Sequence, residues 1–156
     1  MMLRTLVVGY GNTLCGDDAL GPLVIERLRP LLPATELVAC HQLAPELAAT
    51  LSAVDAVIFV DAAVEEGEPG TVRVERLSPA AEQTASLTHH ISPAALLAMS
   101  AELYGRAPKA MLITGVGADF SLYGEASAPL SPAARRALDE ICRLVPLLIE
   151  ADPQSW

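Results

Sequence analysis

The chain opens with an apolar strand, a glycine-rich turn and an amphipathic helix, and this succession constrains the fold more than any other feature. Residues 3–9 (LRTLVVG) form a short apolar run closed by glycine, the pattern of a strand buried on both faces. Apolar residues then recur at steps of three and four, which predicts a helix that ends before Pro33. Its apolar face consists of Leu20, Leu23, Val24, Leu28 and Leu31. A buried strand leading directly into a helix indicates an α/β fold.

The rest of the chain repeats this alternation of strands and helices. Strands are expected at 36–40, 55–62, 70–77 and 109–117, of which 70–77 alternates apolar and charged residues as an edge or antiparallel strand does. Helices are expected at 45–51 and after Ser92-Pro93 and Ser131-Pro132, where serine caps the helix and proline takes its first position. We therefore predict a single domain spanning 1–156, a three-layer α/β/α sandwich around a mostly parallel, mixed five-stranded sheet.

The last helix carries its own amphipathic signature. Its apolar stripe comprises Leu138, Ile141, Cys142, Val145, Leu148 and Ile149. Pro146 falls within this stripe and is expected to kink or interrupt the helix, because proline lacks the backbone N–H that the helix needs.

Composition excludes several classes of function. The 52% hydrophobic content argues against disorder. Because binding to phosphate depends on clustered Lys and Arg, the net charge of −9 makes nucleic acid and an anionic membrane unexpected partners. No apolar run reaches the length of about 18–20 residues that a membrane span requires, and the N-terminus does not read as a signal peptide. The three cysteines show neither disulfide nor zinc-finger spacing, which favours a reducing cytoplasm.

The glycine-rich turn raises the question of a nucleotide. The dinucleotide motif G-x-G-x-x-G is incomplete, because Leu14 stands where the third glycine belongs. Asp17 and Asp18 follow at the start of the helix, where they would repel a pyrophosphate. A nucleotide-binding α/β protein therefore stays an alternative that depends on Gly9 and Gly11 alone.

The acidic residues favour a metal instead. Asp17 and Asp18 follow the first strand, Asp61 ends a later one, and His89-His90 precede a helix. Carboxylates and an imidazole at one edge of a parallel sheet bind divalent ions such as nickel or zinc. The same residues also fit plainer roles, as a helix-capping acid, a loop cap and surface histidines. Cys15 with a histidine is a weaker alternative, a nucleophilic pair without the usual elbow motif.

Ordered segments along nearly the whole chain resemble the [NiFe]-hydrogenase maturation endopeptidases. These segments are VVGYGNTLCGDDALGPLVIERL, VIFVDAA followed by EPGTVRV, and LTHHISPAALL before the last strand and helix. The most specific element is G-x-G-N-x-x-x-x-D-[DE]-x-x-G. It is met by Gly9, Gly11, Asn12, Asp17, Asp18 and Gly21.

The resemblance implies an aspartic-type cytoplasmic endopeptidase that removes the C-terminal extension of a [NiFe]-hydrogenase large-subunit precursor after nickel insertion. It implies that the metal-contacting and catalytic positions are Asp18, Asp61 and His89, with nickel carried by the substrate and no tightly bound cofactor of the enzyme's own. His89 is preferred to His90 because Thr88-His89 keeps the family's spacing to the following helix. A monomer is favoured.

One segment departs from the family pattern. Where family members commonly carry an acid, glycines and threonine linked to substrate recognition, this chain has Cys40-His41-Gln42-Leu43. The departure leaves open which large subunit is recognised. It also leaves an alternative of another class, a non-catalytic nickel-sensing or chaperone-like module that docks to a hydrogenase subunit.

Overall fold

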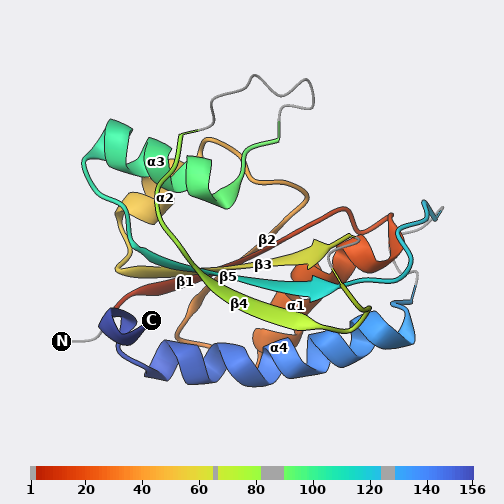
Figure 1. The fold of residues 1–156 in the computed structure, drawn as a ribbon. Coiled ribbons are helices and arrows are strands. Elements are labelled where there is room, and N and C mark those ends of the chain that lie inside the picture. The colour runs from red at the N-terminus through yellow and green to blue at the C-terminus, as the bar shows by residue number, and fades with distance from the viewer. Residues whose placement is uncertain (1–2, 65–66, 82–89, 124–128) are drawn as a thin grey trace.

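The computed structural model describes residues 3–64, 67–81, 90–123 and 129–156. Within these residues the chain forms one five-stranded sheet, ordered β2-β1-β3-β5-β4 (Figure 1). The first four strands in that order are parallel, and β4 pairs with β5 in the antiparallel sense. The strands are β1 (Thr5–Tyr10), β2 (Glu36–Cys40), β3 (Ala56–Ala63), β4 (Val72–Leu77) and β5 (Lys109–Val116).

Helices cover both faces of the sheet. One face packs against α1 (Leu20–Leu28) and α4 (Pro132–Glu150), and the other against α2 (Leu47–Ser52) and α3 (Pro93–Tyr104) (Figure 1). Two short 3₁₀ turns complete the described elements, η1 (Gly16–Ala19) before α1 and η2 (Pro153–Ser155) after α4. This is the predicted three-layer sandwich with a mixed, mostly parallel sheet.

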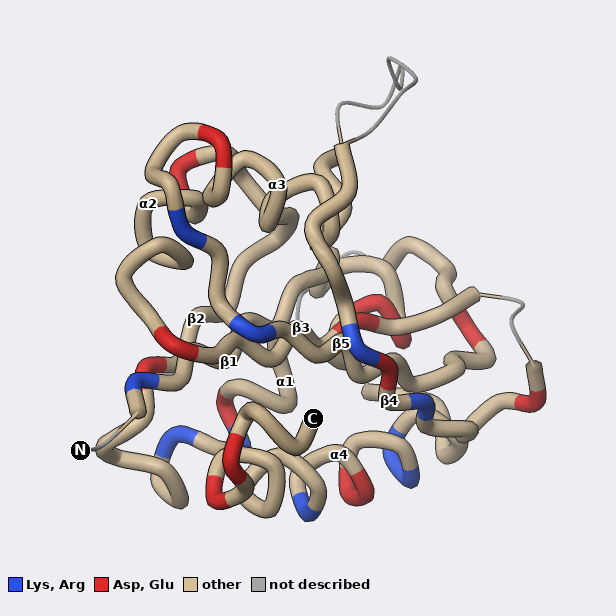
Figure 2. Tube along the Cα trace, turned by 60° about the vertical axis from the view of Figure 1, so that its left-hand side comes forward, with Lys and Arg blue, Asp and Glu red and all other residues tan. Residues whose placement is uncertain are grey.

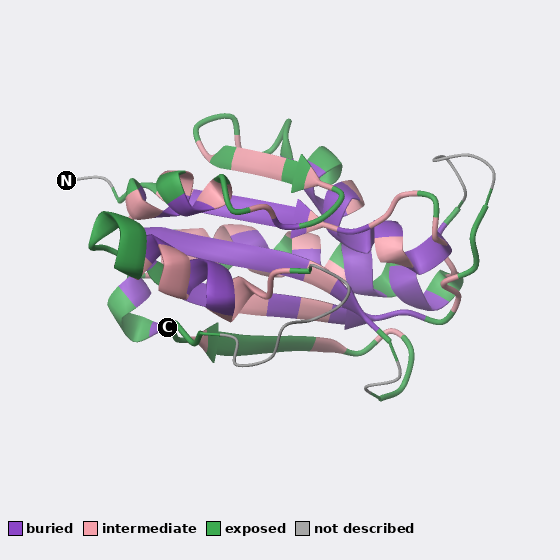
Figure 3. Cartoon of the chain, turned by 90° about the horizontal axis from the view of Figure 1, so that it is seen from above, coloured by how far each residue is buried: buried purple, intermediate pink, exposed green. Residues whose placement is uncertain are grey.

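Burial follows strand position, as the apolar runs predict. The central strands β1 and β3 are almost wholly buried, because helices lie on both of their faces, whereas β4 is exposed along most of its length (Figure 3). The alternating charges of β4 thus mark an edge strand, and the prediction that it is antiparallel is confirmed.

Two apolar cores lie on the two faces. On one, Leu20, Val24 and Leu28 of α1 meet the buried face of α4 and the inward side of the sheet. On the other, Leu96 and Leu97 of α3 pack against α2 and the strands. Fully burying a leucine contributes about 1.5–3 kcal/mol, so these contacts fix where the helices lie on the sheet.

The two Ser-Pro sequences begin helices as predicted. The hydroxyl oxygens of Ser92 and Ser131 each accept a hydrogen bond of 3.1 Å from the backbone N–H three residues later. Each bond satisfies one of the N–H groups that a helix start leaves unpaired, so the caps fix where α3 and α4 begin.

Three details differ from the predictions. Helix α1 ends at Leu28, so Leu31 lies beyond it and is 61% exposed, because Arg29 and Pro30 carry the chain out of the core. Helix α4 runs through Pro146 without interruption, because Val145 before the proline and Leu148 and Ile149 after it pack against the core. Strand β3 continues two residues past Asp61, paired with β5 as far as Ala63.

Among the described helices, none combines the length and the apolar character needed to cross a bilayer. Cys15, Cys40 and Cys142 are free thiols. Cys142 packs against the core beneath α4, and burial raises its pKa to about 11, in keeping with its place on the predicted apolar stripe.

Candidate functional site

The glycines of the N-terminal motif bring α1 close to β1. A Cβ atom at Gly9 would overlap the carbonyl oxygen of Gly21, and a Cβ at Gly21 would lie 2.6 Å from backbone atoms of Tyr10 and Val60. Gly11 has a φ of +152°, which L-residues with side chains rarely adopt, and a Cβ there would collide with the backbone of Asp18. These glycines therefore allow backbone segments to pack closely, which explains their spacing without a nucleotide.

The two adjacent acids, Asp17 and Asp18, have different surroundings. The Asp17 side chain is buried, with the residue only 1% exposed. Its carboxylate accepts four hydrogen bonds: from the backbone N–H groups of Ala118, Asp119 and Ser131 at 2.7, 3.0 and 2.8 Å, and from the Ser131 hydroxyl at 2.6 Å. Asp17 thus ties η1 to the segment that connects β5 with α4.

These hydrogen bonds also control the ionisation of Asp17. Burial alone would raise its pKa, but the Ser131 hydroxyl and the three backbone N–H groups favour the charged form and hold the pKa below its ordinary value. Asp17 is therefore a buried anion whose oxygens are already engaged by donors within the protein. This geometry gives it a structural role.

Asp18 is half-buried and accepts a hydrogen bond of 2.6 Å from the Asn12 backbone N–H through Oδ2. This bond closes the glycine turn over η1, so the motif asparagine supplies its backbone to orient the acid. Unlike Asp17, Asp18 lines an open cavity of about 450 Å³. Its carboxylate is therefore accessible to a ligand.

Asp61 lines the same cavity from β3, close to the carboxyl edge of the sheet. Its Oδ1 accepts a hydrogen bond of 2.8 Å from the following backbone N–H. Tyr10 of β1 lies beside it: burial first, then the charge of Asp61 and a hydrogen bond to its carboxylate, raise the pKa of the Tyr10 hydroxyl. The phenol therefore stays protonated and donates to Asp61.

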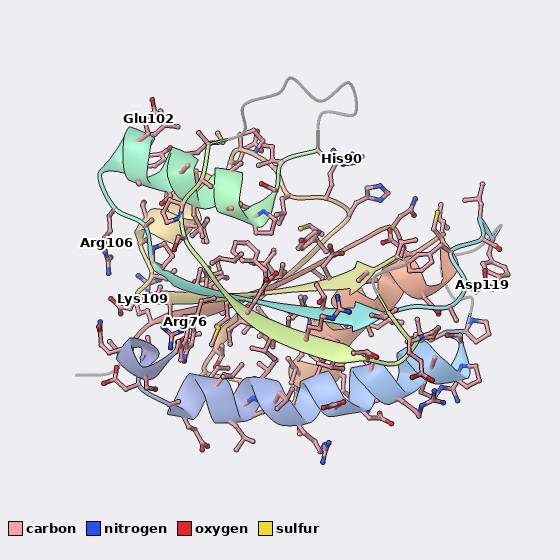
Figure 4. The ribbon with its side chains drawn as sticks, in the orientation of Figure 1. Arg76, His90, Glu102, Arg106, Lys109 and Asp119 are labelled. Carbon is pink, nitrogen blue, oxygen red and sulfur yellow. The ribbon has the colours of Figure 1, made fainter. Side chains whose placement is uncertain are left out.

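Histidines approach this cavity from two directions. His90 lies in the segment before α3, is exposed, and projects from that segment in Figure 4. His41 reaches the cavity from the segment that follows β2. The predicted ligand His89 lies outside the described residues, so the choice between His89 and His90 stays a prediction.

Of the predicted site residues, the structure brings Asp18 and Asp61 to one cavity near the carboxyl ends of β1 and β3, and His90, the alternative to His89, lines the same cavity. Within the described ranges, no three His, Cys, Asp or Glu side chains are grouped closely enough to hold a metal ion. Carboxylate oxygens and imidazole nitrogens are donor types that borderline divalent ions accept.

One residue that lines the cavity, Tyr10, was not predicted. In the sequence, Tyr10 looks like an ordinary residue of the first strand. The pairing of β1 with β3 places it next to Asp61, and this strand position is the signal that could have identified it. The segment that departs from the family pattern lines the cavity through His41, Gln42 and Leu43. Cys15 lines it as well.

Comparison with known proteins identifies the class of protein to which this fold and cavity belong. Residues 31–146 match the family model described as hydrogenase maturation protease. The chain belongs to the hydrogenase maturation protease family, and it is accordingly a hydrolase of the endopeptidase class.

Solved structures agree with this assignment. The chain is similar to a [NiFe] hydrogenase maturation protease, HycI, from Thermococcus kodakarensis, with 25% identity, a TM-score of 0.74 and coverage of 96% of this chain and 94% of that one. An Escherichia coli endopeptidase shares 27% identity with a TM-score of 0.70, covering 92% and 90%. The E. coli hydrogenase maturating endopeptidase HybD, at 23% identity and a TM-score of 0.74, covers 94% and 92% and shows the same fold. No curated protein matches the chain in sequence.

Proposed function

We propose that this endopeptidase removes the C-terminal extension of a [NiFe]-hydrogenase large-subunit precursor once nickel has been inserted, and that nickel reaches the site as part of the substrate. The observation that carries the proposal is the meeting of Asp18 and Asp61, from distant parts of the sequence, in one open cavity of a hydrogenase maturation protease. The cytoplasm is the proposed compartment.

In this proposal Asp18 and Asp61 contact the substrate's nickel through carboxylate oxygens, and His89 does so through an imidazole nitrogen. A divalent ion held beside the scissile peptide polarises its carbonyl or activates water. Tyr10 donates a hydrogen bond to Asp61 and so restricts the orientations of that carboxylate.

If nickel only positions the substrate, a carboxylate must accept the proton of the attacking water. Asp18 is then the better candidate than Asp17, because the oxygens of Asp17 are occupied by four protein donors and are buried. Asp18 has an accessible carboxylate in the cavity. Asp17, which is buried, would then have the structural role, and Asp18, which lines the cavity, would have the chemical role.

The proposal is tested by incubating the purified protein with nickel-loaded and nickel-free precursor and measuring the intact mass of the large subunit. We expect a loss of the C-terminal segment from the loaded precursor alone. Asp18→Asn and Asp61→Asn keep the shape of the side chain but remove an anionic ligand, so each should reduce cleavage by at least about a hundredfold.

The matched control is Asp139→Asn, which alters an exposed acid on α4 that is ion-paired with Arg27. It should cut at the wild-type rate. Wild-type rates for both Asp18→Asn and Asp61→Asn would refute the site, and equal cleavage of the nickel-free precursor would refute the role of nickel.

A further inference from the structure

Five side chains form a row across the sheet at its carboxyl edge. Strand pairing places Tyr10 beside Cys40, Asp61 beside Thr114, and Thr114 beside Arg73, while the pairing of Gly9 with Val60 brings Tyr10 level with Asp61. Residues paired in this way project from the same face of a sheet. The row runs through the strands in spatial order: Cys40, Tyr10, Asp61, Thr114 and Arg73.

Tyr10 and Cys40 pack against the core that α2 and α3 cover, whereas Asp61, Thr114 and Arg73 form the part of the row that lies beyond it. Two residues earlier on the same face, Val8 and Phe59 are fully buried in the core beneath these helices. Asp61 and Thr114 are only half-buried, and Arg73 is exposed. Figure 1 shows α3 over the amino-terminal part of β3 and β5, with the arrowheads of both strands extending past it.

A second cavity, of about 620 Å³, lies over this uncovered surface of β3, β5 and β4. Asp61 lines both this cavity and the one that contains Asp18, so the two meet at that residue. Its other walls include Ala63, Leu112, Thr114, Arg73 and Glu75. Among the described residues, the second cavity therefore extends from Asp61 across β5 to β4.

The lining of the second cavity suits an extended polypeptide. Ala63 and Leu112 give apolar surface, Thr114 offers a hydroxyl, and Arg73 and Glu75 place opposite charges near each other on β4. Basic and acidic positions alternate along this strand (Figure 2). Such a mixture pairs with the N–H and C=O groups of a peptide backbone and does not select a polyanion.

The dimensions agree with a short peptide segment. Asp61 and Arg73 are separated by two strand spacings, about 10 Å, and an extended chain advances about 3.3 Å per residue. About three substrate residues therefore span the distance from Asp61 to Arg73.

We propose that the cavity over β3, β5 and β4 binds the first three or so residues of the segment that is released, those that follow the scissile bond. This inference rests on the proposed function. The cavity with Asp18 and His90 then faces the retained, nickel-bearing body of the substrate, and the far side of Asp61 is left for the chain beyond the cleaved peptide bond.

The first experiment is site-specific photocrosslinking. A benzoylphenylalanine is placed at Val64, a wall of the second cavity that is 54% exposed, and at Leu147, which is 63% exposed on α4 on the opposite face. Each variant is irradiated with nickel-loaded precursor, and the crosslinked peptide is identified by mass spectrometry. We expect Val64 to capture the released segment and Leu147 to capture neither part of the substrate.

Two results would overturn this inference, provided that the wild type still cleaves the same precursor. One is a crosslink from Val64 to the retained body of the substrate, and the other is crosslinking at Val64 no stronger than at Leu147. Absence of cleavage by the wild type would instead overturn the proposed function. The two failures are therefore distinguishable in one set of samples.

A kinetic comparison does not depend on the crosslinker. Arg73→Ala should raise KM about five- to tenfold with kcat changed less than about twofold, because the side chain binds a part of the substrate that does not react. The matched control is Arg76→Ala on the same strand, since Arg76 lies towards the other end of β4 (Figure 4) and pairs with Met111 away from the cavity. Equal KM values for both variants and the wild type would contradict the inference.

Discussion

Replacing Asp17 with asparagine should destabilise the fold, whereas the same change at Asp18 should not. The Asp17 carboxylate receives three hydrogen bonds at Oδ2 and one at Oδ1. An asparagine turned to keep its oxygen in the Oδ2 position places its NH₂ group against the Ser131 N–H. The hydrogen bond from the Ser131 N–H is then replaced by a contact between two donors, and the other three hydrogen bonds no longer have a charged acceptor.

The magnitude follows from these contacts. A hydrogen bond to a charged group contributes about 1.5–3 kcal/mol, and a buried donor without an acceptor costs about 1–3 kcal/mol. We therefore expect Asp17→Asn to lower the free energy of unfolding by about 2–3 kcal/mol. At about 2–4 °C per kcal/mol for a chain of this size, the Tm should fall by about 5–10 °C.

Thermal and urea unfolding followed by circular dichroism measure this difference. Asp18→Asn is the matched control, because Asp18 is half-buried and its hydrogen bond from Asn12 can be kept by the amide oxygen. It should stay within about 1 kcal/mol of the wild type while cleavage collapses. Below its Tm, Asp17→Asn should still cut the precursor. A wild-type Tm for Asp17→Asn, or equal destabilisation by both changes, would refute the division of roles.

Three further predictions concern pH, the histidines and metal content. The folded-state pKa of Asp17 is depressed, so its contribution to stability is present above its unfolded pKa of about 3.9 and is lost as the pH falls through the folded value. The Tm of the wild type should therefore fall more steeply below about pH 4 than the Tm of Asp17→Asn. Parallel plots of Tm against pH for the two proteins would contradict this. His89→Gln should abolish cleavage and His90→Gln should reduce it less, as measured by intact mass, and the reverse ranking would move the site by one residue. Purified protein should contain no stoichiometric metal by elemental analysis and should retain activity towards nickel-loaded precursor after a chelator has been added and removed, whereas a conventional metallopeptidase would be inactivated.

Local sequence determined where most elements lie. The spacing of apolar residues predicted the strands and helices, because the apolar residues of an element lie on the side that packs against the core. The caps at Ser92 and Ser131 were predictable for the same reason, since a serine hydroxyl and the N–H three residues later belong to one short stretch of chain. The placement of Asp18 and Asp61 at one edge followed from the rule that parallel strands end on the same side of a sheet.

Tertiary structure decided what each acid does. Asp17 and Asp18 are neighbours in a 3₁₀ turn, where successive side chains point in directions about 120° apart, so only one of them can face the cavity. Asp17 is buried because its acceptors meet donors at Ala118 and Ser131, more than a hundred residues away, and no local pattern encodes that contact. The pairing of β1 with β3 likewise sets Tyr10 beside Asp61, and the position of β4 at the sheet edge opens the surface beyond Thr114, because strand order depends on packing among elements distant in sequence.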